Sequence, residues 1–198
     1  MRVRLPAPLI LASESPRRRQ LLKQLKIPFK VIPSRLAEPP PYGMDPVTYT
    51  RKLALSKAKI VARQVKSGFV LGADTVVVHR GQILGKPADF VEACKFLQAL
   101  QGTTHRVITG VALVDAATGK HRLAHTVSQV SMRPLSAEQI GRVARLHLDK
   151  AGGYAVQEKR DPLVAHVKGS FSNVVGLPLE LVKELICFLC SRDPGVLS

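Results

Sequence analysis

A short basic stretch near the start of the chain combines residue types suited to holding phosphate. The chain runs from an apolar segment, residues 9–12, through Ser13-Glu14-Ser15-Pro16 to Arg17-Arg18-Arg19. Ser15 suits a helix N-cap and Pro16 the first helical position, which places the arginines in the first turn. Cations are disfavoured at a helix N-terminus. A bound anion, however, would be attracted by the helix dipole, the free backbone N–H groups and the guanidinium groups together. We therefore predict a phosphate site; the alternative is a solvated basic face.

One acidic residue lies inside the most apolar segment of the chain. Asp74 is in the middle of Phe69–Val78, whose apolar residues fall on both faces, as is typical of a central strand. A buried carboxylate must be paired, hydrogen-bonded or bound to a metal, because an unpaired buried charge is strongly destabilising. We predict a functional role for Asp74. The alternative is a structural carboxylate held by backbone amides at a bulge.

Two lysines lie next to segments that we expect to be buried. Residues 83–87 follow an Arg80-Gly81 turn, and pairing with the preceding strand would bring Lys86 near the level of Asp74. Lys57 lies beside the apolar stripe of a helix that we expect to begin at Asp45-Pro46. That stripe consists of Val47, Thr50, Ala54, Ala58, Val61 and Val65. Spacing alone favours a surface lysine at position 57, with its ammonium in solvent.

Composition indicates a globular protein with anionic partners. Of the 198 residues, 45% are hydrophobic and 22% are charged, as is typical of a globular protein. A chain of this length can bury a core, and we expect a single domain, residues 1–198, with one lobe or two. The net charge of +16 indicates nucleotides, nucleic acid or a membrane surface as partners. Tryptophan is absent and aromatics make up 5%, so stacking platforms for nucleic acid are scarce. Nucleic acid is therefore not favoured as the main ligand.

The cysteines and histidines are not favoured as metal ligands. Cys187 and Cys190 form a C-x-x-C in an apolar segment with no second pair of ligands, which favours cysteines packed in a helix core over a zinc or redox site. The six histidines are scattered along the chain and are not favoured as zinc ligands. No segment resembles a signal peptide or a membrane span, so we expect a cytoplasmic protein with no membrane partner.

Strand and helix signals alternate along the whole chain. We expect further strands over residues 29–32, 106–114 and 126–132, and further helices over residues 89–100, 136–146 and 179–189. Residues 164–167 and 171–175 are predicted to form a hairpin around Lys168-Gly169-Ser170. The adjacent Gly152 and Gly153 indicate a close approach of the backbone to another group.

These motifs, taken in order, resemble those of a known family. The first half contains Ser13-Glu14-Ser15-Pro16-Arg17-Arg18, Lys57-Ala58, Gly72-Ala73-Asp74-Thr75-Val76-Val77 and Leu84-Gly85-Lys86-Pro87. The second half contains Gly102-Thr103-Thr104-His105, Thr109-Gly110-Val111, Asp149-Lys150-Ala151-Gly152-Gly153-Tyr154, Gln157 and Asn173-Val174-Val175-Gly176-Leu177-Pro178. From about residue 9 to residue 189, the chain is similar to the Maf family of nucleoside triphosphate pyrophosphatases.

The resemblance implies a fold and a reaction. The fold would be mixed α/β, with a strongly curved central sheet flanked by helices and two lobes around a deep cleft, as in inosine triphosphate pyrophosphatases. The reaction would cleave a nucleoside triphosphate between its α- and β-phosphates with the help of a divalent cation, Mg²⁺ or alternatively Mn²⁺. The family also often forms homodimers.

The resemblance further implies roles for individual residues. Asp74 matches the family's proton acceptor, and four residues match positions that bind the triphosphate: Ser13, Arg18, Lys57 and Lys86. Of these, Lys57 and Lys86 are expected to assist catalysis with Asp74. Arg17, Thr75 and Gln157 match the subgroup that acts on dTTP and UTP.

Triphosphate hydrolysis needs cations at the phosphates, a metal bridging their oxygens and a base near the attacking water. Glu38 is the second carboxylate expected to bind the metal beside Asp74. The competing hypothesis is a non-catalytic regulator of cell division that binds nucleotides or nucleic acid. Such a protein has no need for a carboxylate inside an apolar strand.

Overall fold

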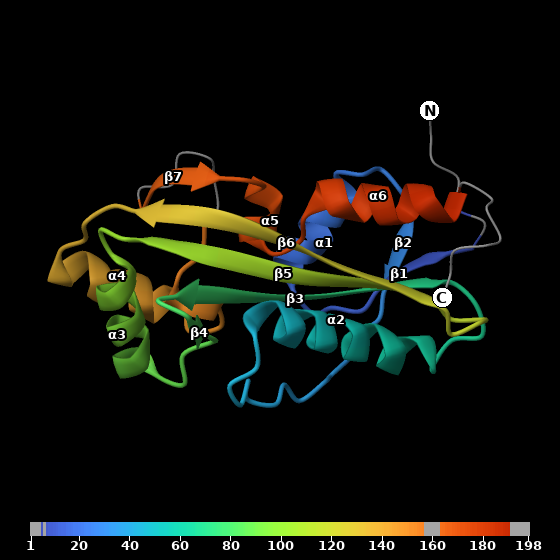
Figure 1. The fold of residues 1–198 in the computed structure, drawn as a ribbon, viewed down its shortest axis with the longest axis horizontal. Helices are drawn as coiled ribbons and strands as arrows, with labels where there is room; N and C mark the ends of the chain where they lie inside the picture. Colours follow the sequence, from blue (N-terminus) through green and yellow to red (C-terminus); the bar gives the residue numbers. More distant parts are fainter. Residues whose placement is uncertain (1–4, 6, 157–162, 191–198) are drawn as a thin grey trace.

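The computed structural model describes residues 5, 7–156 and 163–190 and shows a mixed α/β fold (Figure 1). Its strands are β1 (Leu9–Leu11), β2 (Phe29–Val31), β3 (Phe69–His79), β4 (Gln82–Leu84), β5 (Thr104–Asp115), β6 (His121–Met132) and β7 (Val164–Lys168). Its helices are α1 (Pro16–Lys23), α2 (Pro46–Ala62), α3 (Phe90–Leu100), α4 (Ala137–Leu146), the 3₁₀ turn η1 (Ala151–Gly153), α5 (Phe171–Val175) and α6 (Leu179–Cys190).

The strands form one open sheet with both parallel and antiparallel pairs. Its order is β2-β1-β3-β5-β6-β7, with β4 added to β3. Strand β1 runs parallel to β2 and β3, whereas the remaining pairs are antiparallel. The mixed α/β class implied by the resemblance is therefore confirmed, and Asp74 lies on a central strand as predicted.

One edge of β3 is only partly covered. Strand β5 pairs with residues 69–78 along one edge. On the other edge, β1 pairs with residues 69–71 and β4 with residues 77–79. Residues 72–76 lie between these two partners, and no described strand covers them there. Asp74 is at the centre of this uncovered segment.

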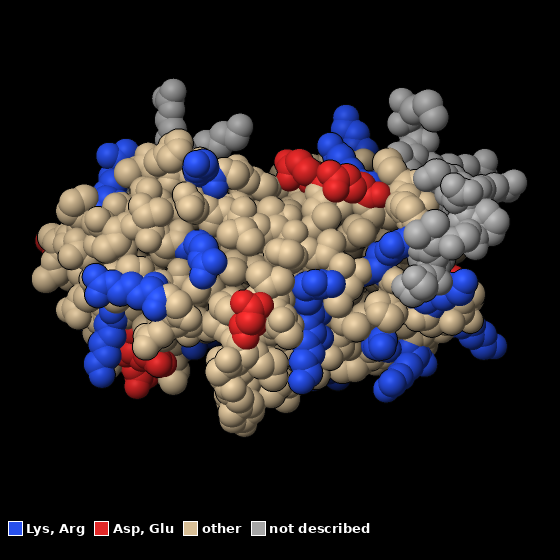
Figure 2. Space-filling view, viewed as in Figure 1, with Lys and Arg blue, Asp and Glu red and all other residues tan. Residues whose placement is uncertain are grey.

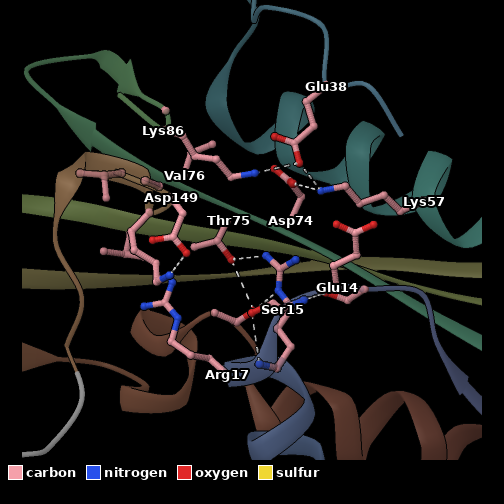
Figure 3. A pocket seen from close by; sticks show the side chains of 18 of the residues that line it. Glu14, Ser15, Arg17, Glu38, Lys57, Asp74, Thr75, Val76, Lys86 and Asp149 are labelled. Carbon is pink, nitrogen blue, oxygen red and sulfur yellow. Dashed lines mark hydrogen bonds and ion pairs between the residues drawn. The ribbon is translucent and has the colours of Figure 1, made fainter. Parts of the chain in front are cut away.

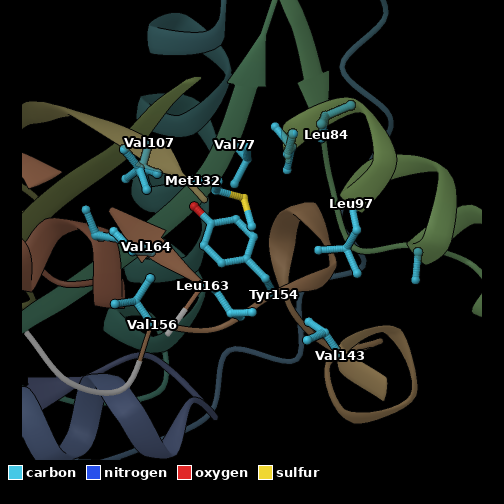
Figure 4. Close-up of a cluster of buried hydrophobic side chains, with 14 of the residues drawn as sticks. Val77, Leu84, Leu97, Val107, Met132, Val143, Tyr154, Val156, Leu163 and Val164 are labelled. Atoms are coloured by element: carbon cyan, nitrogen blue, oxygen red, sulfur yellow. The ribbon is translucent and has the colours of Figure 1, made fainter. Parts of the chain in front are cut away.

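Alternation along β3 sends neighbouring side chains to opposite faces of the sheet. Val76 and Val78 pack with Tyr49 and Leu53 of α2 on one face, which Figure 1 shows below the sheet. The other face carries two separate apolar clusters. One joins β1 and β3 to α1 and α6. The other surrounds Tyr154 between α3, α4 and the ends of β3 and β5 (Figure 4). These clusters form the cores of two lobes that share the long strands.

Helix α2 lies unusually close to the sheet because glycines face it. A Cβ atom added to Gly72 would lie 2.2 Å from the carbonyl oxygen of Ala54, and one added to Gly110 would lie 2.5 Å from that of Thr50. Gly110 is also the cross-strand partner of Asp74. The helix backbone therefore rests directly on β3 and β5 beside this carboxylate.

Two sequence predictions are wrong in this part of the molecule. Residues 171–175 form helix α5 and not the second strand of a hairpin. The Ser170 side chain accepts a hydrogen bond from the N–H of Asn173 and caps the helix, which ends at Gly176 with a φ of 121°. Cys187 is exposed on α6 and does not pack in the core. The predicted close approach at Gly152 is confirmed, since an added Cβ would lie 2.9 Å from Val77.

Basic side chains are scattered over the face shown in Figure 2 in separate groups. No helix among the described residues is long and apolar enough to cross a membrane. Gln157, a predicted site residue, lies outside the described part of the chain.

The contact between α2 and β5 gives a test of stability. Gly110→Ala should lower the free energy of unfolding by about 3 kcal/mol, because the methyl group overlaps the backbone of α2. Gly141→Ala is the matched control: it lies in α4 with no atom within 4 Å of an added Cβ. We expect it to leave stability unchanged or to raise it by up to about 1 kcal/mol. Urea unfolding measures both, and equal values would contradict the close approach.

Candidate active site

A cavity of about 530 Å³ lies at the uncovered edge of β3. All predicted site residues within the described part of the chain line it: Ser13, Arg17, Arg18, Glu38, Lys57, Asp74, Thr75 and Lys86. Figure 3 shows Glu38, Lys57, Asp74 and Lys86 gathered at one side, with Arg17 and Asp149 at another. Segments distant in sequence thus supply carboxylates, ammonium groups and guanidinium groups to one space.

The Lys57 ammonium joins the two carboxylates of the cavity. Its Nζ lies 2.6 Å from Oδ1 of Asp74 and 2.7 Å from Oε1 of Glu38. Lys57 is only 7% exposed, so the surface lysine favoured by spacing is wrong. The cause is the close packing of α2 at Gly72 and Gly110, which turns the Lys57 side of the helix toward β3.

The surroundings of Asp74 change its affinity for protons. Burial raises the pKa of Asp74 above its ordinary value, and the positive charges of Lys57 and Arg18 oppose this rise without cancelling it. A carboxylate with a raised pKa binds protons more strongly than an exposed one. Its position at the uncovered strand edge gives it access to the cavity.

Glu38 is held beside Asp74 by the loop that precedes α2. The hydroxyl of Tyr49 donates to the carbonyl oxygen of Pro39 at 2.7 Å and fixes this loop to the helix. Burial opposes ionisation of Glu38, but the hydrogen bond and charge of Lys57, with the charge of Lys86, lower its pKa overall. The Lys86 Nζ is 3.7 Å from Oε1 of Glu38, as expected once β4 pairs with β3.

The two carboxylates are arranged around a positive charge. Among the described residues, Oδ2 of Asp74 and Oε2 of Glu38 make no hydrogen bond or ion pair. The same residues contain no group of three or more His, Cys, Asp or Glu side chains able to hold a metal alone. Mg²⁺ typically takes one or two protein carboxylates and completes its shell with water and phosphate oxygens. This donor set therefore fits a magnesium ion that binds together with phosphates.

The N-terminus of α1 faces the same cavity. The Ser15 side chain accepts from the N–H of Arg18 and caps the helix, and Ser13 Oγ accepts from the N–H of Ser15. Arg18 Nε donates to the carbonyl oxygen of Gly176 at 2.8 Å, and its Nη2 donates to Thr75 Oγ1 at 3.0 Å. The predicted anion site is thus a capped helix end with a fixed guanidinium group.

Sequence reasoning did not assign several residues that line the cavity. They are Glu14, Arg35, Tyr49, Asp149, Lys150, Tyr154 and Gly176. The pKa of Arg17 is lowered by burial and by the charge of Arg18, and the charge of Asp149 opposes this change only in part. Five of the unassigned residues belong to the recognised motifs, so the signal for them was present in the sequence: Glu14, Asp149, Lys150, Tyr154 and Gly176.

His105 lies behind the cavity in the core that surrounds Tyr154. Its side chain is 2% exposed, and its Nε2 is 2.6 Å from the hydroxyl oxygen of Tyr154. Burial, assisted by the charge of His79, lowers the pKa of His105 from 6.5 to about 4. Because this value lies below that of the unfolded chain, the unfolded state takes up the proton first as pH falls. Stability is therefore lost as the pH falls through this interval.

This histidine should make stability depend on pH. Between pH 7 and pH 5 we expect its contribution to the free energy of unfolding to fall by about 2 kcal/mol. His105→Gln should lose that component, whereas His166→Gln, at an exposed position on β7, should keep it. Urea unfolding of the three proteins at both pH values measures the difference. Parallel pH dependence of wild type and His105→Gln would contradict it.

Comparison with known proteins finds relatives that match most of the chain. A family model described as Maf-like protein matches residues 8–188. The dTTP/UTP pyrophosphatase of Pelotomaculum thermopropionicum is 43% identical over 180 residues, which cover 90% of this chain and 94% of that protein. The nucleoside triphosphate pyrophosphatase of Xylella fastidiosa is 44% identical over 183 residues, covering 90% and 96% respectively. The dTTP/UTP pyrophosphatase of Alcanivorax borkumensis is 44% identical over 188 residues, covering 90% and 93%. With this match along most of its length, the chain belongs to the Maf family.

Proposed function

We propose that this protein hydrolyses dTTP, UTP and modified pyrimidine triphosphates to the nucleoside monophosphate and pyrophosphate. The observation that carries the proposal is the buried Asp74, paired with Lys57 in a cavity that also contains Arg18 and Lys86. The dTTP/UTP pyrophosphatases that resemble the whole chain support the same reaction.

The cations and the helix end bind the triphosphate in this proposal. Arg18, Lys57 and Lys86 line the cavity and provide positive charge for the phosphates. Ser13 and the N-terminus of α1 add donors suited to phosphate oxygens. Phosphoryl chemistry depends mainly on positioning and charge stabilisation, which this set of groups supplies.

Asp74 accepts the proton of the attacking water. Its raised pKa makes it a stronger base than an exposed carboxylate, and its ion pair with Lys57 holds the side chain in place. The water oxygen attacks the α-phosphorus as its proton passes to the carboxylate, the bond from this phosphorus to the α–β bridging oxygen breaks, and pyrophosphate leaves. In a protein that only bound nucleotides, this negative charge beside the phosphates would weaken nucleotide binding.

Asp74 and Glu38 are the residues proposed to hold Mg²⁺, or alternatively Mn²⁺. When bound, such an ion polarises phosphate oxygens and neutralises charge that develops on the leaving group. Lys57 contacts both carboxylates, so its ammonium must share them with the metal.

Selection of the pyrimidine base is proposed for Arg17, Thr75 and Gln157 on the basis of the family resemblance. Arg17 lies in the cavity on the same side as Asp149, and Figure 3 shows this pair apart from Asp74. We further propose a cytoplasmic protein that forms a homodimer.

The first test is pyrophosphate release with Mg²⁺ from dTTP, UTP, CTP, 5-methyl-UTP, 7-methyl-GTP and ITP. We expect turnover of dTTP and UTP, and a fall in kcat of about 10²–10⁴-fold in Asp74→Asn, which lacks the base. Removal of the metal with EDTA should abolish turnover, and added Mg²⁺ should restore it. Full activity of Asp74→Asn would reject the mechanism, and turnover restricted to purine triphosphates would reject the proposed substrates.

The pH profile tests the pairing of Lys57 with Asp74. Because the Lys57 charge favours the ionised carboxylate, Lys57→Met should raise the pKa of Asp74 further. The acidic limb of kcat/KM should therefore move to higher pH. Lys86→Met is the control, because Lys86 pairs with Glu38 and not with Asp74; it should weaken substrate binding and leave the limb in place. An unmoved limb in Lys57→Met, or an equal shift in both variants, would contradict this assignment.

A further inference from the structure

A chain of hydroxyl groups connects the phosphate-binding arginine to the interior of the protein. Arg18 Nη2 donates to Thr75 Oγ1 at 3.0 Å. Thr75 Oγ1 is 2.9 Å from Thr109 Oγ1, which in turn donates to the carbonyl oxygen of Asn173 at 3.3 Å. Thr75 and Thr109 are cross-strand partners on β3 and β5, so the sheet register itself sets their contact.

The carbonyl groups that accept from this chain limit its possible directions. A threonine hydroxyl has one proton to donate, and a carbonyl oxygen only accepts. When Thr109 gives its proton to Asn173, it accepts the proton of Thr75; when Thr75 donates to Gly176 instead, Thr109 can donate to Thr75. In both arrangements the Thr75 oxygen accepts from Arg18. The alternative contact from Thr75 to the carbonyl oxygen of Gly176 is longer, at 3.4 Å.

The far end of the chain is rigidly held. Thr109 and Asn173 are both 0% exposed. The Asn173 side-chain amide donates to the carbonyl oxygen of Val107 and to Ser128 Oγ, each at 3.0 Å, which ties α5 to β5 and β6. Helix α5 ends at Gly176, whose carbonyl oxygen accepts from Arg18 Nε. Both acceptors of the guanidinium group therefore depend on the same helix.

We propose that Thr109 is a positioning residue for triphosphate binding, which acts on Arg18 through Thr75. This inference rests on the proposed function. Thr109 does not itself line the cavity among the described residues, whereas Arg18 and Thr75 do. The Nε proton and one Nη2 proton bind fixed acceptors, so the guanidinium plane is set. Its other N–H groups make no hydrogen bond to the described residues and can bind phosphate. Orienting a flexible arginine before binding lowers the entropic cost of association.

Equilibrium binding of α,β-imido-dUTP, which resists hydrolysis, tests the proposal without turnover. Isothermal titration calorimetry with Mg²⁺ should show about tenfold weaker binding by Thr109→Val, corresponding to loss of one hydrogen bond. Thr109→Ser keeps the hydroxyl and should bind within about threefold of wild type. Inorganic tripolyphosphate has no base, so a similar loss for this probe assigns the effect to the phosphates.

Two further variants make the test specific. Thr104→Val removes another threonine hydroxyl from β5. The Thr104 Oγ1 lies 2.8 Å from Ser131 Oγ, and neither residue lines the cavity, so this variant should bind the nucleotide as wild type does. In an Arg18→Lys background, the effect of Thr109→Val should vanish, because the guanidinium group it orients is gone. Thr109→Ala, which removes the hydroxyl without adding volume, replaces the valine variant if that variant does not fold.

The outcomes separate this inference from the proposed function. Three results would overturn the inference alone. They are unchanged affinity in Thr109→Val, a loss of affinity in Thr109→Ser equal to that in Thr109→Val, or an undiminished effect of Thr109→Val on affinity in the Arg18→Lys background. Wild-type protein that neither binds the imido nucleotide nor releases pyrophosphate from dTTP or UTP would overturn the proposed function, and this inference with it. We expect weaker nucleotide binding by Thr109→Val, near wild-type binding by Thr109→Ser, and no further loss of affinity when Thr109→Val is added to Arg18→Lys.

Discussion

The incomplete covering of one strand edge is the constraint on which the site depends. Strand β1 ends after pairing with residues 69–71 of β3, and β4 pairs only from residue 77 onward. A strand directs successive side chains to opposite faces, so Asp74 and Thr75 would be separated by a continuous sheet. At an uncovered edge both can line one cavity. The same end of β1 leads through Ser13 and Ser15 into α1, so the phosphate-binding helix end meets the carboxylate there.

Placing Asp74 in this position requires a partner for its charge. Removing a carboxylate from water is strongly unfavourable, and an ion pair inside the protein compensates only when its geometry is good. Gly72 and Gly110 allow α2 to approach the sheet closely enough for Lys57 to reach Asp74 at 2.6 Å. The pair keeps the carboxylate in place, while burial keeps its pKa raised. Packing at two glycines thus has a direct chemical consequence in the cavity.

A polar layer separates the two apolar cores on the opposite face of the sheet. Thr75, Thr109 and Asn173 lie between the cluster around α1 and α6 and the cluster around Tyr154. Their hydroxyl, amide and carbonyl groups are linked to one another and to Arg18. Such a layer fixes side-chain orientation more precisely than apolar packing, because each donor and acceptor needs a specific partner. The position of Arg18 is therefore set by the junction of the two lobes.

The sequence by itself determined the local features and the family. The sequence predicted Asp74 in an apolar strand and the helix starts at Ser15-Pro16, Asp45-Pro46 and residue 136, because propensity, capping and periodicity depend on near neighbours. The order of the motifs indicated the membership of the Maf family that the comparisons established. Only the tertiary structure decided that Lys57 is buried, that residues 171–175 form a helix, and that Thr75 holds Arg18. Each of these depends on atoms brought together from distant segments, and spacing along one segment does not reveal what packs against it.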